Sequence, residues 1–205
     1  MRKGFSLLET LVALAVLAVF TAALLAFTQG SLGANRLARK QAQLLEELKD
    51  AAGYLADTLQ EAQRVFNSTT LNGQACAPPT CLAVLVPDPV NPGKCALRAY
   101  RLEPRSGVGE DYKAPDPWAD THTLMLREYR LSNLGCNTAT FSNAQPYVVL
   151  DLVDNDPNLA PFRVGASPTS ITLNIRLKAQ EAGRTLRVPG PNEAYTIRVY
   201  PRNVP

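Results

Sequence analysis

The first thirty residues contain the longest apolar run in the chain. Hydrophobic side chains fill most positions from Phe5 to Phe27, and Glu9 is the only charged residue among them. At about 1.5 Å of rise per residue, Leu7 to Phe27 form a helix long enough to cross a hydrocarbon layer of roughly 30 Å. The pattern therefore predicts a transmembrane helix half over residues 5–30, in which an ionised carboxylate favours a partner cation. The alternative is that the Glu9 side chain extends to the lipid headgroups and has no further role.

Beyond the apolar run, the hydrophobic residues follow the period of an amphipathic helix. From residue 31 onwards they recur at spacings of three, four or seven. This stripe consists of Leu37, Leu44, Leu48, Ala51, Leu55, Leu59, Ala62 and Phe66. Because no proline interrupts residues 1–66, we expect one long helix whose second half, 31–66, packs on the domain that follows. A coiled-coil dimer is the alternative, but the heptad run is short and Gly53 interrupts it.

After Asn67 the hydrophobic period shortens towards two, which is typical of β-strands. The expected strands are Leu82–Val86, Ala96–Leu102, Thr123–Leu131, Tyr147–Val153, Ile171–Leu177 and Tyr195–Tyr200. Alternation of apolar and polar residues in the last two indicates a sheet with one solvated face. The prediction is an α+β fold, in which the long N-terminal helix packs on an antiparallel β-sheet domain of residues 67–205.

Composition limits the soluble part to one domain. Of the 205 residues, about 30 lie in the apolar segment, and the remainder suffices for one modest core. All 16 prolines lie at position 78 or later, which separates a helix-permitting front from a turn-rich back. The formal net charge of +3 falls to +1 without Arg2 and Lys3. The total charge therefore gives no strong indication of a nucleic-acid partner.

The residues around Glu9 form a recognisable motif. Gly4-Phe5-Ser6-Leu7-Leu8-Glu9 follows a short basic leader and precedes the apolar run. This arrangement resembles the prepilin cleavage signal of type IV pilins and type II secretion pseudopilins, over about 30 residues. The resemblance implies that a prepilin peptidase removes the leader 1–4 by cutting between Gly4 and Phe5, and that the new amino terminus at Phe5 is N-methylated.

Assembly is the role that the resemblance implies for Glu9. In related filaments the corresponding glutamate neutralises the amino terminus of a neighbouring subunit as the helices bundle. Two other kinds of segment compete with this interpretation. A secretory signal peptide has an apolar region of only about 7–15 residues before its cleavage site, and a plain single-span anchor does not explain the glutamate.

The order of the later elements resembles the larger minor pilins. A long helix, a cysteine-containing loop and several strands end in Tyr-Thr-Ile-Arg-Val-Tyr-Pro-Arg-Asn. The final Arg202-Asn203 is similar to the ends of W-type minor pilins and J-type pseudopilins. One departure is Ala26, which stands where many pilins have a proline, so a kink there is not implied.

Four cysteines follow the apolar segment. Because positive charge stays on the cytoplasmic side, Arg2 and Lys3 place the rest of the chain in an oxidising compartment, where disulfides are expected. Four cysteines allow three pairings; we favour Cys76 with Cys81 and Cys95 with Cys136. A zinc site is the alternative, but C-x2-C pairs are missing.

Signs of ligand chemistry are weak in the remaining sequence. The single histidine, His122, has no nucleophile pattern beside it and is expected on the surface. Asp151, Asp154 and Asp156, with Asn155 and Asn158, offer oxygen ligands for calcium, but the spacing is not that of an EF-hand and is also typical of a turn. No cofactor is expected.

Arg127 and Arg130 are the only basic residues that suggest nucleic acid. Glu128 interrupts the patch, so a solvated sheet face is the favoured interpretation. The sequence as a whole indicates a non-enzymatic minor pilin-like subunit with a type II secretion pseudopilin as the first alternative. We expect it in the bacterial inner membrane, with one span and a periplasmic domain, and then in a filament with other pilins. A membrane-anchored protein that binds DNA or another ligand is the second alternative.

Overall fold

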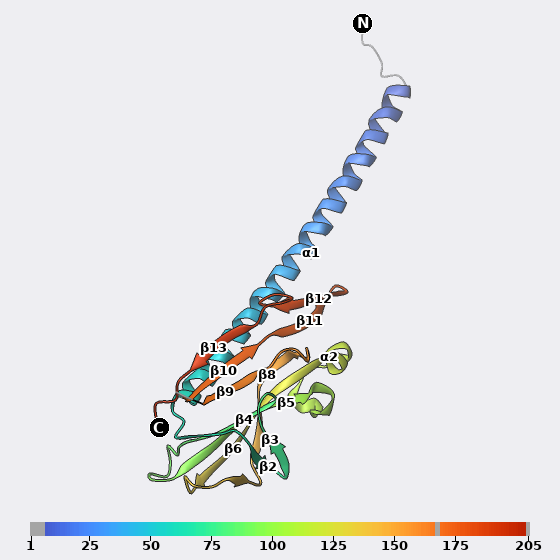
Figure 1. Cartoon of the computed structure of the whole chain (residues 1–205). Helices are drawn as coiled ribbons and strands as arrows, with labels where there is room; N and C mark the ends of the chain where they lie inside the picture. The colour runs from blue at the N-terminus through green and yellow to red at the C-terminus, as the bar shows by residue number, and fades with distance from the viewer. Residues whose placement is uncertain (1–6, 167–168, 204–205) are drawn as a thin grey trace. The chain divides into compact units, whose positions relative to one another are not determined.

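The computed structural model describes residues 7–166 and 169–203. One long helix is followed by a domain built mainly from strands, an α+β architecture of the pilin type (Figure 1). The chain divides after Lys40 into two compact units. The first contains the beginning of the helix, and the second contains the helix from Gln41 onwards and all the strands.

Helices and strands alternate irregularly along the chain. The helices are α1 (Leu7–Gln60) and α2 (Pro117–His122), with short 3-10 turns η1 (Arg105–Gly107) and η2 (Glu110–Tyr112). The strands are β1 (Arg64–Phe66), β2 (Thr69–Leu71), β3 (Gln74–Cys76), β4 (Cys81–Pro87), β5 (Cys95–Pro104), β6 (Thr123–Leu134), β7 (Thr140–Phe141), β8 (Gln145–Asp154), β9 (Phe162–Ala166), β10 (Thr169–Ile175), β11 (Leu177–Glu181), β12 (Arg184–Val188) and β13 (Tyr195–Val199).

The helix α1 ends at Gln60, not at Phe66 as the apolar stripe predicts. The Gln63 amide donates to the carbonyl of Leu85, and Arg64–Phe66 then form β1, which pairs antiparallel with β4. Phe66 packs edge-on against Phe141. The spacing of Phe66 thus continues the helical period although its side chain packs in a sheet.

Three sheets make up the domain. The largest has seven strands in the order β1-β4-β5-β6-β8-β11-β12, and every two neighbouring strands in it are antiparallel. A second sheet has the order β13-β10-β9, and a third has the order β3-β2-β7. The prediction of an antiparallel sheet is therefore confirmed for the main sheet, while β2 and β7 pair in parallel.

Each predicted strand is present, but one of them corresponds to parts of two strands in the structure. The predicted strand Ile171–Leu177 is two strands: Ile175 of β10 pairs with Tyr195 of β13, whereas Leu177 of β11 pairs with Val153 of β8. The chain changes sheets at Arg176, and the apolar alternation runs through this change. The short strands β1, β2, β3, β7, β9 and β12 and the helix α2 were not predicted.

The main sheet has an apolar cluster on each face. On one face the buried stripe of α1, which includes Leu44, Leu48, Leu55 and Leu59, packs with residues such as Leu82 and Tyr100. On the other face, residues that include Leu71, Leu85, Leu97 and Phe141 form a second cluster. The buried stripe of α1 between Gln41 and Gln60 thus belongs to the domain core, as the amphipathic pattern predicts.

Candidate functional site

The first part of α1 carries large apolar side chains that are open to the surroundings. Leu7 is 82%, Val19 is 72% and Phe27 is 74% exposed. By length and composition, α1 is the one helix in the described part of the chain that is apolar enough to cross a membrane. Exposing such a run to water is unfavourable, at roughly 25 cal/mol per Å² of apolar surface. This surface therefore requires lipid or other apolar helices around it.

The polar side chains in this apolar run bond to the helix itself. The hydroxyls of Thr10, Thr21 and Thr28 donate to the carbonyls of Leu7, Leu17 and Leu25 at 2.8, 2.9 and 2.9 Å. In lipid, an unpaired hydroxyl has no water to bond, so these internal bonds remove the penalty. The helix runs through Ala26 without a break.

Glu9 lies in the first turn of α1. There the helix dipole favours a negative charge. The predicted cleavage residues Gly4 and Phe5 lie outside the described residues, so the geometry of the cleavage site remains a prediction.

A buried carboxylate joins α1 to the main sheet. Glu128 on β6 has no exposed surface. It accepts hydrogen bonds from the Tyr54 hydroxyl at 2.8 Å, the Tyr100 hydroxyl at 3.3 Å and Arg130 Nε at 2.7 Å, and Arg98 Nη1 lies 3.4 Å away. Burial and the adjacent carboxylate raise the pKa of Tyr54 and Tyr100, so both hydroxyls remain donors.

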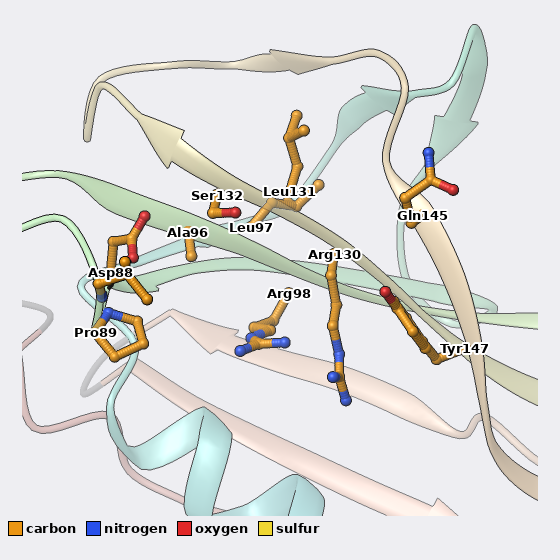
Figure 2. Close-up of a pocket in the computed structure, with 11 residues that line it drawn as sticks. Asp88, Pro89, Ala96, Leu97, Arg98, Arg130, Leu131, Ser132, Gln145 and Tyr147 are labelled. Atoms are coloured by element: carbon orange, nitrogen blue, oxygen red, sulfur yellow. Dashed lines mark hydrogen bonds between the residues drawn. The ribbon is translucent and has the colours of Figure 1, made fainter.

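The two arginines beside Glu128 border a pocket of about 360 Å³ (Figure 2). Arg98 and Arg130 are register partners on β5 and β6, and their side chains extend side by side in Figure 2. The Arg130 guanidinium lies 4.5 Å from the ring centroid of Tyr147. Asp88 at the rim accepts from the Val90, Asn91 and Asn133 amides, and with the Asn91 side chain these bonds lower its pKa to about 2. The charged groups that border the pocket are thus ion-paired or hydrogen-bonded, and its lining also includes the apolar residues Val90, Leu97 and Leu131.

Arg127 and Arg130 do not form a free basic patch on the described surface. Arg127 pairs with Glu103 at 2.9 Å, and Arg130 pairs with Glu128 at 2.6 Å. The expectation of a solvated face is wrong for Glu128, which is buried, and the Arg127 side chain is only 13% exposed. The local pattern could not reveal this burial, because the tyrosine partners of Glu128, Tyr54 and Tyr100, lie on α1 and β5.

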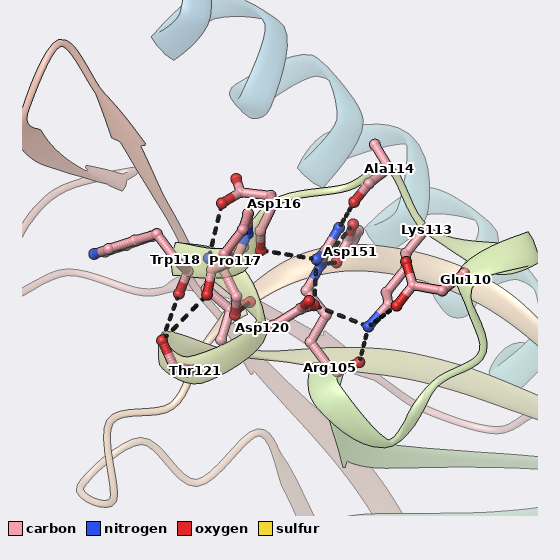
Figure 3. A network of polar contacts seen from close by, with 12 residues as sticks. Arg105, Glu110, Lys113, Ala114, Asp116, Pro117, Trp118, Asp120, Thr121 and Asp151 are labelled. Atoms are coloured by element: carbon pink, nitrogen blue, oxygen red, sulfur yellow. Dashed lines mark hydrogen bonds and ion pairs between the residues drawn. The ribbon is translucent and has the colours of Figure 1, made fainter.

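A second network ties the segment 105–122 to β8 (Figure 3). The buried Arg105 donates from Nε to Asp151 at 2.9 Å, from Nη1 to Asp120 at 2.5 Å and from Nη2 to the Ala114 carbonyl at 2.6 Å. Lys113 Nζ lies 2.9 Å from the same Asp120 carboxylate. Hydrogen bonds from Lys113 and Arg105 lower the pKa of Asp120. Sequence reasoning missed this network because its members lie on different elements, with Arg105 in η1, Asp120 in α2 and Asp151 in β8.

The weak calcium candidate receives no support from the geometry. Asp151 bonds to Arg105, while Arg176 Nε donates to Asp154 at 2.7 Å and Arg176 Nη2 donates to Asp156 at 2.6 Å. Guanidinium groups thus occupy the carboxylates that calcium would require. Within residues 7–166 and 169–203, no group of three or more His, Cys, Asp or Glu side chains is placed to hold a metal ion.

His122 lies at the exposed end of α2. Its ring stacks on Trp118 at a centroid distance of 4.8 Å, and Nδ1 lies 2.8 Å from the Trp118 carbonyl. Asp116 caps this short helix by accepting from the Ala119 amide at 2.9 Å, with Pro117 in the first turn. These contacts place His122 on the surface, as expected.

All four cysteines are in disulfides. Cys76 is bonded to Cys81 and Cys95 to Cys136, which are the pairings that the sequence favours. The first bridge spans five positions of the chain and the second spans 41. The second connects the start of β5 to the segment just after β6, and so links the ends of two neighbouring interior strands of the main sheet.

Comparison with known proteins identifies the N-terminal segment. Residues 1–25 match the family model described as the prokaryotic N-terminal methylation motif. Searches of curated proteins and of solved structures returned no match. The match covers the part of the chain that contains Gly4, Phe5 and Glu9.

Proposed function

We propose that this chain, whose residues 1–25 match the prokaryotic N-terminal methylation motif, is a minor structural subunit of a type IV pilus. The observation that carries the proposal is the combination of this motif with an exposed apolar helix. From Leu7 to Phe27 the helix has a surface suited to lipid before assembly and to other subunit helices afterwards.

Processing is the first step of the proposed function. The prepilin peptidase cuts between Gly4 and Phe5 and methylates the amino group of Phe5. Glu9 then pairs with the amino terminus of an adjacent subunit. In an apolar bundle an unpaired carboxylate is strongly penalised, and a neighbouring ammonium removes much of that penalty. Glu9 thereby fixes the axial position of one helix against the next.

The β domain supplies the subunit's individual surface. Two disulfides support a location outside the cytoplasm, and Arg2 and Lys3 before the span support a periplasmic domain. The size of this domain and its ending favour a minor subunit at or near the filament tip, in a pilus that serves motility, adhesion or DNA uptake.

A pseudopilin of a type II secretion system is the second candidate. The resemblance of Arg202-Asn203 to J-type pseudopilins favours it. Here these residues close the end of α1, since the Arg202 amide donates to the Gln60 carbonyl at 3.0 Å and Asn203 Nδ2 donates to the Glu61 carbonyl at 3.4 Å. The two filaments differ in the machine that assembles them, so removing each assembly ATPase in turn distinguishes them.

The test follows the chain from membrane to filament. In a host with the assembly machinery, the wild-type chain should lose its leader and appear in sheared pili. Gly4→Leu should keep the leader and remain in the membrane, and Glu9→Gln should be cut but depleted from pili. Glu47→Gln, which removes an exposed carboxylate outside the apolar run, is the matched control. Normal cleavage of Gly4→Leu, or absence of the wild-type chain from every filament, would overturn the proposal.

A further inference from the structure

Two arginines in the pocket of Figure 2 share one carboxylate. Arg98 Nη1 lies 3.4 Å from Glu128 Oε1, and Arg130 Nη2 lies 2.6 Å from Glu128 Oε2. The Glu128 side chain has no exposed surface, whereas those of Arg98 and Arg130 are 23% and 41% exposed and line the pocket. Figure 2 shows both guanidinium groups on the same side of β5 and β6, between Pro89 and Tyr147. Two positive charges thus share one buried negative charge, and their exposed side faces the pocket.

These guanidinium groups have hydrogen-bond donors to spare. An arginine side chain carries five N–H donors. In the described part of the chain, the Arg98 side chain makes one hydrogen bond, through Nη1, while Arg130 bonds through Nε and Nη2 to Glu128 and Tyr54. Nε and Nη2 of Arg98 and Nη1 of Arg130 are therefore left for other acceptors. Guanidinium groups bind carboxylates well because two N–H donors can meet the two oxygens at once.

The remaining walls of the pocket are suited to hydrocarbon. Tyr147 on β8 and Val90 in the loop between β4 and β5 line the pocket with exposed side chains, and Leu131 lines it with a half-buried one. Covering such apolar surface is favourable because it removes the surface from water. The volume of about 360 Å³ lies at the lower end of the range for small-ligand sites. The pocket therefore has room for a small group with one polar and one apolar end.

Asp88, the third charged residue in the lining, has no free hydrogen-bonding capacity. Its Oδ1 accepts from the Val90 and Asn91 amides, and its Oδ2 accepts from the Asn133 amide and the Asn91 side chain. Each oxygen thus accepts two bonds, and the residue is buried. The two arginines are the charged groups of the pocket that can still bind a ligand.

We propose that this pocket binds an organic carboxylate, whose oxygens accept hydrogen bonds from Arg98 and Arg130 and whose apolar or aromatic body lies against Tyr147 and Val90. A carboxylate supplies the one negative charge that the two arginines and Glu128 lack. A phosphate dianion exceeds this charge and brings no hydrocarbon to the apolar walls. The carboxylate belongs either to a small molecule or to an acidic side chain of another protein. This inference goes beyond the proposed function and does not depend on the filament that the chain joins.

Titration of the full-length chain in detergent micelles tests the site. The probe is para-fluorobenzoate, followed by fluorine NMR, and neutral para-fluorobenzamide of similar shape controls for partition into the micelles. We expect saturable binding of the benzoate with a dissociation constant on the order of 1 mM, because the ligand has few atoms. The benzamide should bind about tenfold more weakly. Equal titration curves for the two probes would overturn the proposal.

Replacing one arginine locates the binding in the pocket. Arg98→Met removes one guanidinium group, while Glu128 keeps its bonds from Arg130 and Tyr54. We expect about tenfold weaker binding of the benzoate. Arg98→Lys keeps the charge without the planar fork and should give an intermediate loss. Arg184→Met, at an exposed arginine outside the pocket, is the matched control and should bind as the wild-type chain does. A folded Arg98→Met variant with unchanged affinity would overturn the proposal.

A charge change at the exposed Val90 keeps the test decisive even where Arg98→Met fails to fold. Val90→Glu and Val90→Lys replace the same exposed side chain by larger ones of opposite charge. Repulsion of the bound carboxylate predicts about threefold weaker binding for Val90→Glu, and attraction predicts about threefold tighter binding for Val90→Lys. Equal affinities of the two variants would contradict a carboxylate in this pocket.

A peptide probe separates the two sources of the carboxylate. A phenylalanine–glutamate dipeptide blocked at both ends carries only a side-chain carboxylate, and its glutamine analogue is the control. Binding of the acidic dipeptide that Arg98→Met weakens supports the proposal and assigns the site to a partner protein. Binding of the benzoate alone supports it and assigns the site to a small molecule. Tighter binding of inorganic phosphate than of either carboxylate would overturn the proposal, because the site would then select charge alone.

Discussion

The two halves of this protein place their side chains in opposite ways. In α1 from Leu7 to Phe27, large apolar side chains face outwards and the few hydroxyls bond inwards to the helix. In the β domain, apolar residues fill the core and charged residues such as Glu128 and Arg105 are buried with their partners. The first half depends on external lipid or helices, whereas the second supplies its own partners.

This contrast separates assembly from folding. The exposed apolar surface of α1 does not select one axial position against a neighbouring helix, because the hydrophobic effect is non-directional. Directional information in this half has to come from a charged group, and Glu9 is the only charged residue between Phe5 and Phe27. The domain uses its charges internally, so the changes below should affect one half and leave the other intact.

The largest effect on the domain is expected from the long disulfide. Replacing Cys95 and Cys136 by serine opens a link across 41 positions, which on the chain-entropy model costs about 4 kcal/mol. Opening Cys76–Cys81, across five positions, should cost about 2 kcal/mol. Urea unfolding of the two variants in detergent, followed by tryptophan fluorescence, measures the difference. Equal losses would mean that the bridge is not acting through loop length.

A charge in the middle of the apolar run should disable the first half only. Leu17→Arg places a cation at the centre of the span, at a cost of about 3.5 kcal/mol for insertion. Alkaline extraction of membranes should release this variant, while the control Leu17→Ile should stay. The unfolding midpoint of the domain should be the same in both. A lower midpoint for Leu17→Arg would show that the two halves are coupled.

Breaking the Glu128 cluster should weaken the domain without affecting insertion. Glu128→Gln leaves Arg98 and Arg130 without their carboxylate, and we expect a loss of about 3 kcal/mol, since both arginines still reach solvent. Glu103→Gln, at a carboxylate that is 21% exposed, is the control and should cost less. Both losses can be read from urea unfolding, and a larger loss for Glu103→Gln would contradict the ranking by burial.

The elements that sequence reasoning found are those set by local period. The apolar run and the stripe of Leu44, Leu48, Leu55 and Leu59 predict α1 to within six residues of its end. Glu128 was not recognised as buried because its partner Tyr54 lies 74 positions away. The break at Arg176 was missed because the alternation continues through it while the pairing changes from β13 to β8.

The candidate site divides in the same way. Gly4, Phe5 and Glu9 lie within six consecutive residues, so the sequence alone suffices to propose them, and their roles in cleavage and assembly stay predictions. The networks around Arg105 and Arg176 are formed by residues brought together by the fold, and no spacing in the sequence indicates them. The favoured cysteine pairing agrees with the structure. Cys81 and Cys95 begin strands near those that the period predicts, whereas Cys76 ends β3, which was not predicted.

The smallest effect is a pH dependence at the rim of the pocket. The side-chain bond from Asn91 and the amides of Asn133 and Val90 lower the pKa of Asp88 to about 2 from its ordinary 3.8. The folded state therefore gains stability from this carboxylate above pH 3.8, and loses it as the pH falls towards 2. Asp88→Asn should flatten this part of the curve of melting temperature against pH. An unchanged slope of melting temperature against pH in the acid range would mean that Asp88 does not contribute to this pH dependence.

The central claim is that the exposed apolar helix belongs to a processed filament subunit. The most direct test is the intact mass of the protein isolated from its native membrane, read for the first residue and its methylation. The account predicts a chain that begins at N-methylated Phe5, with all four cysteines oxidised. A chain that still begins at Met1, or one cut between Gly30 and Ala34, would contradict it and indicate a plain anchor or a signal peptide.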